Sequence, residues 1–280
     1  SCKDQIGIVA NISSILAKHN CNIVESKQFT DQENGHFFIR QSFTLSNINV
    51  LSKLEDDLLI LSNDLNAEFF LSDIQSSMNT IMLVSKFDHC LNDILYRVRN
   101  NSLNLNIKAI VSNHKIAEEI ANFSKIPFYY FPVDKSNKEK QELKIKNLII
   151  KNDVEMIVLA RYMQVLSEEF TNEFEGKIIN IHHSFLPSFK GAKPYHQAFE
   201  RGVKVIGATA HYVTSDLDEG PIIEQDTQVV DHEMMPNNLV SMGRDIESRV
   251  LYRALKAHSE RRVFLNGNRT VVFKGHRILG

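Results

Sequence analysis

KIINIHHSFLPSFKGAKPYHQAFERGVKVIGATAHYVTSDLDEGPIIE, running from Lys177 to Glu224, is the stretch that decides the fold of this chain. It opens on an apolar run typical of a strand, and along a strand the side chains of Asn180 and His182 project from the same face. A second β-type run, Val205–Val213, ends in Thr214–Pro221, a loop rich in carboxylates and turn residues. Because α/β sheets usually carry chemistry at their strand ends, the stretch predicts a site made of an amide, an imidazole and an acidic loop.

Composition places the chain among ordinary globular proteins. Its 280 residues predict two domains, and 43% hydrophobic residues are enough for their cores. The net charge of −2 and the absence of a long basic run argue against nucleic acid as a partner, and no apolar stretch reaches the roughly 18 residues of a membrane span. Three cysteines without CxxC spacing predict neither a disulfide framework nor a zinc ribbon, so we expect a cytoplasmic protein.

The first quarter of the chain shows helical and strand periodicities in turn. Apolar residues spaced three and four apart predict helices, whereas alternating and β-branched segments predict strands. The expected elements are a helix over 6–19, strands over Cys21–Phe29 and His36–Leu45, a helix over Val50–Leu61 and a strand over Ala67–Leu71. With one further strand before them, these elements make a ferredoxin-like, split βαβ fold of the α+β class.

From Thr80 the pattern changes to alternating strands and helices. This alternation predicts an α/β domain with right-handed crossovers and a Rossmann-like, mostly parallel sheet that has helices on both faces. The first strand–helix turn, Ser85–Cys90, contains no glycine, although phosphate-binding loops need glycine for close approach of the backbone. We therefore expect no nucleotide site in this domain.

The segment CKDQIGIVANISSILAKHNCNIV, residues 2–24, resembles the ACT domain, a small regulatory module that often binds an amino acid. The resemblance implies an ACT-like domain over residues 1–72, with effector-binding positions at Asp4, Gly7 and Asn22. In that family a first strand precedes the turn that begins at Asp4, and we expect this strand to be missing here. Because fold alone does not establish a ligand, a dimerisation module that binds nothing is the alternative.

Three motifs in the rest of the chain resemble the folate-dependent formyltransferase fold. They are LARYMQVLS at 159–167, INIHHSFLP at 179–187 and HYVTSDLDEGPII at 211–223. The resemblance extends from Thr80 to about Phe264. It implies a linker over residues 73–79 and a catalytic domain of the formyltransferase type over residues 80–280.

The whole chain resembles the formyltetrahydrofolate deformylase family. The reasons are the ACT module in front of the formyltransferase motifs and His183, which stands where the transferases usually have proline. The family hydrolyses 10-formyltetrahydrofolate to formate and tetrahydrofolate. This reaction supplies formate for purine synthesis and balances the one-carbon folate pools.

The resemblance implies that Asn180, His182 and Asp218 are catalytic, with no metal and no cofactor, since folate is the substrate. Hydrolysis of an N-formyl group needs stabilisation of a tetrahedral oxyanion and proton delivery to the departing nitrogen. The Asn180 amide can direct an N–H dipole at the oxyanion, worth roughly 2.7–4 kcal/mol. A histidine ordinarily titrates near neutral pH and can shuttle the proton. Asp218 either acts as the base for the water or orients His182.

The same resemblance implies that the pterin ring of folate lies against the backbone of the LARYMQVLS motif and of the acidic loop. The candidate substrate-binding residues are Met163, Gln164, Val165, Leu166 and Thr214, and His89 is a candidate for positioning the water. Val165 and Leu166 fit a core position equally well. His211, seven residues before Asp218, either supports the acidic loop or packs within its strand.

The neighbouring histidines His182 and His183 raise the question of a metal site. Adjacent residues of a strand point to opposite faces of the sheet, and no third ligand has suitable spacing. We therefore expect no metal at this pair.

Two other functions stay open on the sequence alone. A formyltransferase of the glycinamide ribonucleotide type would pass the formyl group to an amine, although the glycine-free first turn argues against an acceptor that carries phosphate. A non-catalytic amino-acid or folate sensor is the second alternative, and Asn180, His182 and Asp218 argue against it. Because ACT modules commonly pair between subunits, we expect a homo-oligomer, with glycine or methionine as candidate effectors.

Overall fold

The computed structural model describes residues 1–134, 136–186 and 194–275. The described chain forms two compact units, one of Ser1–Ile74 with residues 271–275, and one of Gln75–Thr270. The sequence predicts a catalytic domain over residues 80–280, and the structure groups residues 271–275 with the first unit, while residues 276–280 lie outside the described residues. The Lys27 side chain donates a hydrogen bond to the Lys274 carbonyl, which is one contact that ties this segment to the first unit.

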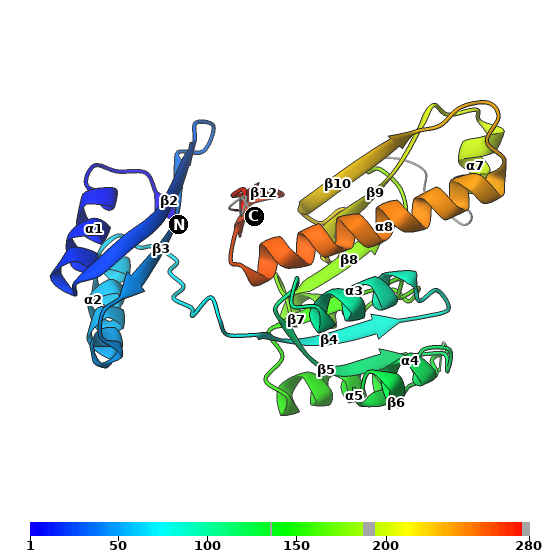
Figure 1. The fold of residues 1–280 in the computed structure, drawn as a ribbon, viewed down its shortest axis with the longest axis horizontal. Coiled ribbons are helices and arrows are strands. Elements are labelled where there is room, and N and C mark those ends of the chain that lie inside the picture. The colour runs from blue at the N-terminus through cyan, green and yellow to red at the C-terminus, as the bar shows by residue number, and fades with distance from the viewer. Residues whose placement is uncertain (135, 187–193, 276–280) are drawn as a thin grey trace. The chain divides into compact units, whose positions relative to one another are not determined.

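The N-terminal unit is a three-stranded antiparallel sheet with two helices packed on one face (Figure 1). Its elements are β1 (Cys2–Lys3), α1 (Ile8–Lys18), β2 (Cys21–Asp31), β3 (His36–Leu45), the 3-10 helix η1 (Ile48–Val50) and α2 (Leu51–Asp64), with strand order β1-β3-β2. Leu16 of α1 is buried together with Leu54 and Leu58 of α2. Burial of these leucines is the physical reason for the helical spacing in the sequence.

Two strand predictions for this unit are wrong. β1 is a two-residue strand in which Cys2 lies opposite Phe37 of β3, so the first strand is short rather than missing. The segment 67–71 is not a strand: Glu68 exchanges two backbone hydrogen bonds with Ser1, but the segment does not form a ladder among the described residues. Two bonds make a single bridge and do not propagate a ladder.

The second unit is built on a seven-stranded sheet with the order β10-β9-β8-β7-β4-β5-β6 (Figure 1). Its elements are β4 (Met78–Val84), α3 (His89–Arg99), β5 (Leu105–Ser112), α4 (Glu118–Phe123), β6 (Phe128–Tyr130), α5 (Lys138–Lys151), β7 (Met156–Leu159), α6 (Glu168–Glu173), β8 (Ile178–His182), α7 (Pro194–Glu200), β9 (Val205–Tyr212), β10 (Ile222–Val229) and α8 (Pro236–Ser259). The last pieces, β11 (Val263–Asn266) and β12 (Arg269–Val272), form a hairpin. The strands β4 to β8 are mutually parallel, whereas β9 runs antiparallel to both of its neighbours. The predicted fold class is confirmed.

Helices cover both faces of this sheet. One core joins the strands to α3, α4, α7 and α8, and a second core on the other face joins them to α5 and α6. The short helices α6 and α7 were not predicted, because six or seven residues are too few to display a helical period. No helix among the described residues is long and apolar enough to cross a membrane.

The register between β8 and β9 positions the polar residues of the central stretch. Asn180 lies opposite His211, and His182 lies opposite Thr209. Because Asn180 and His182 alternate with apolar neighbours, both project from the face that Ile178 shares with the core beneath α5 and α6. The predicted common face of the amide and the imidazole is therefore present in the fold.

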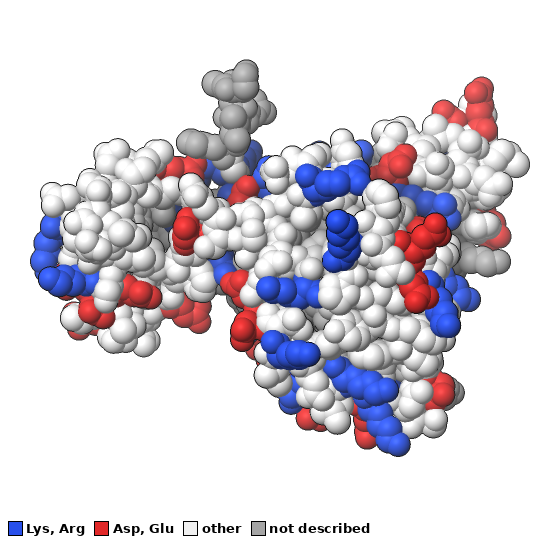
Figure 2. Space-filling view, turned by 60° about the horizontal axis from the view of Figure 1, so that its bottom comes forward, with Lys and Arg blue, Asp and Glu red and all other residues white. Residues whose placement is uncertain are grey.

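The surface carries charges of both signs. On the face drawn in Figure 2, lysine and arginine side chains are interspersed with aspartate and glutamate on each of the two units. This mixture agrees with the net charge of −2.

Candidate active site

The acidic loop folds back over β8 and β9, which brings the predicted catalytic residues together. Asp218 Oδ1 lies 3.1 Å from Nδ1 of His182 and 3.7 Å from Nε2 of His211. The Asn180 amide nitrogen lies 3.2 Å from the same His211 Nε2. An amide, two imidazoles and a carboxylate from two strands and one loop thus form a connected cluster.

His211 fixes the orientation of the Asn180 amide. Its Nδ1 lies 2.8 Å from the carbonyl oxygen of Tyr212 and therefore donates to it, which leaves Nε2 as the acceptor of the neutral ring. In that form Nε2 accepts the hydrogen bond of the Asn180 amide and thereby fixes the orientation of the amide. In the sequence, the seven-residue spacing between His211 and Asp218 was a signal for this role, but it did not distinguish the role from packing of His211 within its strand.

Asp218 has an unusual backbone conformation and a perturbed carboxyl group. Its φ of 59° lies in the left-handed region, which aspartate tolerates better than most residues. Burial opposes ionisation, but the hydrogen bond from His182 outweighs it and holds the pKa of Asp218 well below its ordinary 3.8. The carboxylate is therefore ionised at neutral pH.

His182 presents one nitrogen to Asp218 and leaves the other without a partner. The residue is 7% exposed, and its Nε2 is buried with no hydrogen-bond partner among the described residues. A buried polar atom without a partner costs free energy unless something else satisfies it. Nε2 is therefore the atom of this cluster that is placed to meet a substrate or a water molecule.

The expectation that His183 points away from His182 is wrong. β8 ends at His182, and the two rings stack with their centroids 4.9 Å apart and their planes 29° from parallel. Burial, followed by the charges of Arg161 and His182, lowers the pKa of His183 to about 4. The second imidazole is therefore neutral at neutral pH and lies against the first.

Residues 78–255 match the family described as Formyl transferase, and residues 1–59 match the family described as ACT domain. The formyltetrahydrofolate deformylase of Corynebacterium sp. (strain P-1) is 44% identical over 274 residues, which cover 98% of this chain and 96% of that protein. The chain belongs to the formyltetrahydrofolate deformylase family. The crystal structure of formyltetrahydrofolate deformylase from Burkholderia mallei ATCC 23344 has a TM-score of 0.94 and 44% identity, and it covers 98% of this chain and 97% of that one.

A glycinamide ribonucleotide transformylase shares part of the architecture of this chain. The structure of glycinamide ribonucleotide transformylase 1 from Symbiobacterium toebii has a TM-score of 0.67 at 25% identity, and it covers 74% of this chain and 98% of that one. The resemblance inferred from the sequence motifs is thereby confirmed at the level of fold. The deformylases match the ACT unit as well.

The predicted folate contacts occupy a loop between β7 and α6 in this deformylase family member. Met163 and Val165 are 54% and 56% exposed, whereas Leu166 is buried in the core beneath α5 and α6. The backbone nitrogen of Met163 is already taken, since it donates to Ser85 Oγ at 3.0 Å. Thr214 Oγ1 donates to the Asp216 carbonyl and stabilises the acidic loop.

Below α8 lies a buried ionic cluster that the sequence did not reveal. Glu247 is 1% exposed and accepts hydrogen bonds from the Tyr195 hydroxyl at 2.7 Å and from the His89 ring at 2.8 Å. Arg161 Nε lies 3.3 Å from the same carboxylate. Burial opposes ionisation of Glu247, but the bond from His89 and the charge of Arg161 lower its pKa below the ordinary 4.5. Removing one partner of a buried ion pair costs about 3–5 kcal/mol, so the cluster is stable only as a set.

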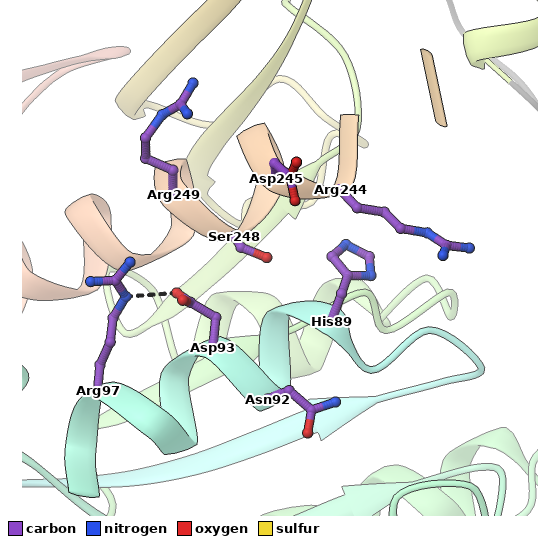
Figure 3. A pocket seen from close by; sticks show the side chains of 8 residues that line it. All are labelled: His89, Asn92, Asp93, Arg97, Arg244, Asp245, Ser248 and Arg249. Carbon is purple, nitrogen blue, oxygen red and sulfur yellow. Dashed lines mark hydrogen bonds and ion pairs between the residues drawn. The ribbon is translucent and has the colours of Figure 1, made fainter. Parts of the chain in front are cut away.

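His89 begins α3 as expected, and its ring links this cluster to a surface pocket. The pocket, of about 540 Å³, lies between α3 and α8 (Figure 3). Two of its arginines are paired, Arg97 with Asp93 at 2.7 Å and Arg249 with Asp226 at 2.8 Å. The pocket therefore presents mixed, largely neutralised charge rather than an anion site.

Ligand atoms of His89, Cys90 and Glu247 lie within 4.8 Å of one another, close enough for one metal ion to be held by all three. The positive charge of Arg161 against the same carboxylate opposes a cation there. Burial also raises the pKa of the Cys90 thiol far above its ordinary 9.0, so the thiolate that binds metals does not form. We propose no metal at this cluster.

Two of the three expected effector residues, Asp4 and Gly7, lie in the short connection between β1 and α1. Gly7 caps α1 with φ 95°, and the Asp4 backbone nitrogen donates to the Gly35 carbonyl at the turn between β2 and β3. Asn22 pairs with Thr44 at the opposite end of that hairpin. Within one chain, Asn22 therefore lies apart from Asp4 and Gly7.

We expect Gly220→Ala to lower turnover by about 100-fold, because a misplacement of about 1 Å in a catalytic group has an effect of that size. A Cβ at this position would lie 1.8 Å from the Tyr212 carbonyl oxygen, the acceptor of His211 Nδ1. The acidic loop would have to move, and Asp218 with it. The matched control is Ser215→Ala, an exposed change in the same loop. Equal turnover of the two variants would contradict this role of Gly220.

Proposed function

We propose that this chain hydrolyses 10-formyltetrahydrofolate to formate and tetrahydrofolate, with Asn180, His182 and Asp218 as its catalytic residues. The observation that carries the proposal is the buried Nε2 of His182, which has no hydrogen-bond partner among the described residues and whose Nδ1 is held by Asp218. Membership of the deformylase family supplies the substrate. Formate produced in this way supports purine synthesis and balances the one-carbon folate pools.

The geometry favours Asp218 as the group that orients His182. The Asp218 carboxylate accepts a hydrogen bond from Nδ1–H of His182, so the neutral ring has its lone pair on Nε2. Nε2 takes a proton from the attacking water while the water oxygen forms a bond to the formyl carbon. It then returns the proton to N10 of the folate as the carbon–nitrogen bond breaks and formate leaves.

Asn180 serves the oxyanion of the tetrahedral intermediate. One N–H of its amide donates to His211, which holds the side chain still, and the second N–H is the donor for the developing negative oxygen. The amide bears no net charge and is held by a neighbouring strand, so little reorganisation is needed during the reaction.

We also assign substrate recognition to the segment from Met163 to Leu166, including Gln164, together with Thr214. The Met163 nitrogen already donates to Ser85, so the other backbone donors and acceptors of this segment are the groups proposed to meet the edge of a pterin ring. In this scheme His89 does not contact the water directly, because Nε2 of its ring already hydrogen-bonds Glu247. No cofactor is needed besides the folate substrate.

Regulation is assigned to the ACT unit. We propose an amino-acid effector, with glycine and methionine as the first candidates, and a cytoplasmic homo-oligomer in which ACT units pair. Asp4 and Gly7 are the effector positions that one chain places together, and Asn22 would join them only from another subunit.

The direct test measures formate and tetrahydrofolate released from 10-formyltetrahydrofolate with no acceptor present. We expect equal amounts of the two products. Glycinamide ribonucleotide is then added in a parallel reaction. Release that requires this amine would identify a formyltransferase and overturn the hydrolase, while binding of folate or amino acid without either reaction would identify a sensor.

A further inference from the structure

Three neighbouring strands align a row of polar side chains at the proposed active site. His182 of β8 lies opposite Thr209 of β9, and Thr209 lies opposite Gln225 of β10 (Figure 1). Side chains of directly paired residues share one face of a sheet, with Cβ atoms about 4.5–5.5 Å apart. Thr209, which is 0% exposed, is therefore an immediate neighbour of the proposed proton carrier.

The Thr209 hydroxyl uses all of its hydrogen-bonding capacity. It donates to the Ser184 carbonyl at 3.0 Å, and it accepts from the Leu186 backbone nitrogen at 3.1 Å and from Nε2 of Gln225 at 2.9 Å. A hydroxyl has one donor and two acceptor positions, so none is left over. The Gln225 amide also donates to the Leu186 carbonyl at 3.0 Å. Together these bonds tie the segment Ser184–Leu186, which follows β8, to the two strands beside it.

This segment begins where β8 ends and the chain bends. A continued strand would turn the His183 side chain to the face opposite His182. The backbone instead bends at His183 and Ser184, and the two imidazole rings stack with their centroids 4.9 Å apart. The Ser184 carbonyl belongs to this bend. The bond from Thr209 therefore holds the backbone next to His183.

A glycine of β9 leaves room for the segment to cross the sheet. A Cβ at Gly207, two residues before Thr209, would lie 3.3 Å from the Cβ of Phe185. Phe185 therefore lies close against the backbone of β9. The missing side chain at Gly207 and the hydroxyl at Thr209 together fix the path of the chain after β8.

We propose that Thr209 is a positioning residue of the hydrolysis. Its hydroxyl holds the bend after β8, and the His183 ring, turned back by that bend, keeps the His182 ring oriented so that Nε2 meets the substrate. The hydrogen bond to Asp218 holds Nδ1 of the His182 ring but permits rotation about that bond, and a stacked ring opposes the rotation. This inference rests on the proposed function and deepens it, because it names what orients the proton carrier besides Asp218. Thr209 touches no reacting atom.

The first experiment compares Thr209→Val with Thr209→Ser in steady-state formate release by the full chain. Valine has nearly the shape of threonine but no hydroxyl, so kcat should fall about 10- to 100-fold, because a misplacement of about 1 Å in a catalytic group costs about 100-fold. KM should change little. Thr209→Ser keeps the hydroxyl and should retain most of the kcat. Normal kcat in Thr209→Val, or an equal loss in both variants, would overturn the proposal.

The matched control is Thr80→Val in β4. Thr80 is likewise 0% exposed, and its hydroxyl donates to the Met78 carbonyl at 3.0 Å. The same chemical change at this position should lower the thermal unfolding midpoint, as in Thr209→Val, but should leave kcat unchanged. If kcat fell equally in the two valine variants, the loss would be a general effect of removing a buried hydroxyl, and the assigned role would be wrong.

Substitutions of His183 test the second half of the path, and they remain informative if Thr209→Val does not fold. His183→Ala removes the stacked ring and should lower kcat by the same 10- to 100-fold, whereas His183→Phe keeps a flat ring and should retain most of the kcat. The double variant with Thr209→Val should be no worse than the more impaired single variant, because both act through one path. Equal losses in His183→Ala and His183→Phe, or multiplied losses in the double variant, would contradict the inference.

NMR of labelled histidine rings supplies a readout that does not depend on turnover. The ring signals of His182, assigned by comparison with His182→Ala, should shift in Thr209→Val and in His183→Ala, because a stacked ring changes the magnetic environment of its neighbour. They should stay in place in Thr80→Val. Unshifted His182 signals in Thr209→Val would overturn the proposal. An unaltered chain that releases no formate would instead overturn the hydrolysis, and the signals would still show whether Thr209 holds the stack.

Discussion

Asp218→Asn should lower kcat by about 10²- to 10⁴-fold, the range that acid–base catalysis contributes. The carboxylate lies 3.1 Å from His182 Nδ1 and accepts a hydrogen bond from its N–H. An asparagine amide at this position can offer N–H instead, which favours the tautomer with the proton on Nε2 and blocks that atom as a base. The fold should persist, because Asp218 belongs to a loop and remains 21% exposed.

Steady-state kinetics and folate binding separate chemistry from recognition in this variant. We expect KM and folate affinity to change little while kcat falls, since the interaction acts on the transition state. Asp216→Asn is the matched control, because Asp216 is an exposed aspartate of the same loop, and it should keep normal turnover. Near-normal kcat in Asp218→Asn would mean that another group orients His182.

His182→Ala should also lower kcat by about 10²- to 10⁴-fold, because the proposed proton carrier is removed. The Asp218 carboxylate would lose the hydrogen bond that contributes most to its lowered pKa, so that pKa should rise. The sign follows from the fact that a hydrogen bond to the charged form favours ionisation. Measurement of kcat, together with folate binding, checks the prediction.

His232→Ala is the control for this second variant, since His232 is exposed between β10 and α8. It should match the unaltered chain. Added imidazole should restore part of the activity of His182→Ala, because the deleted ring leaves a space beside Asp218. Turnover that survives the His182 change without imidazole would contradict the assigned proton path.

Local chemistry made part of the site predictable. Alternation along a strand places Asn180 and His182 on one face whatever the rest of the chain does, and the structure has them there. Asp218 was predicted from the motif of the acidic loop, and in the structure this loop brings its carboxylate to His182. In the N-terminal unit, the spacing of Leu16, Leu54 and the residues around them likewise marked the buried helix faces.

The failures have a common cause in long-range contacts. The strand expected over 67–71 depended on a partner strand, and the segment makes a single bridge, between Glu68 and Ser1, instead of a ladder. The pair His182 and His183 was judged by strand alternation, which no longer applies where β8 ends. A rule of local geometry holds only while the element continues.

The sequence by itself determined the class of fold, the face that bears Asn180 and His182, and the acidic loop, because these depend on residues close together in the chain. Only the tertiary structure decided that His211 fixes the Asn180 amide, and that Arg161 and Glu247, 86 positions apart by their numbers in the sequence, form one buried ion pair. The charge that a buried group experiences is set by neighbours in space and by the exclusion of water. Neither quantity is written in the order of residues.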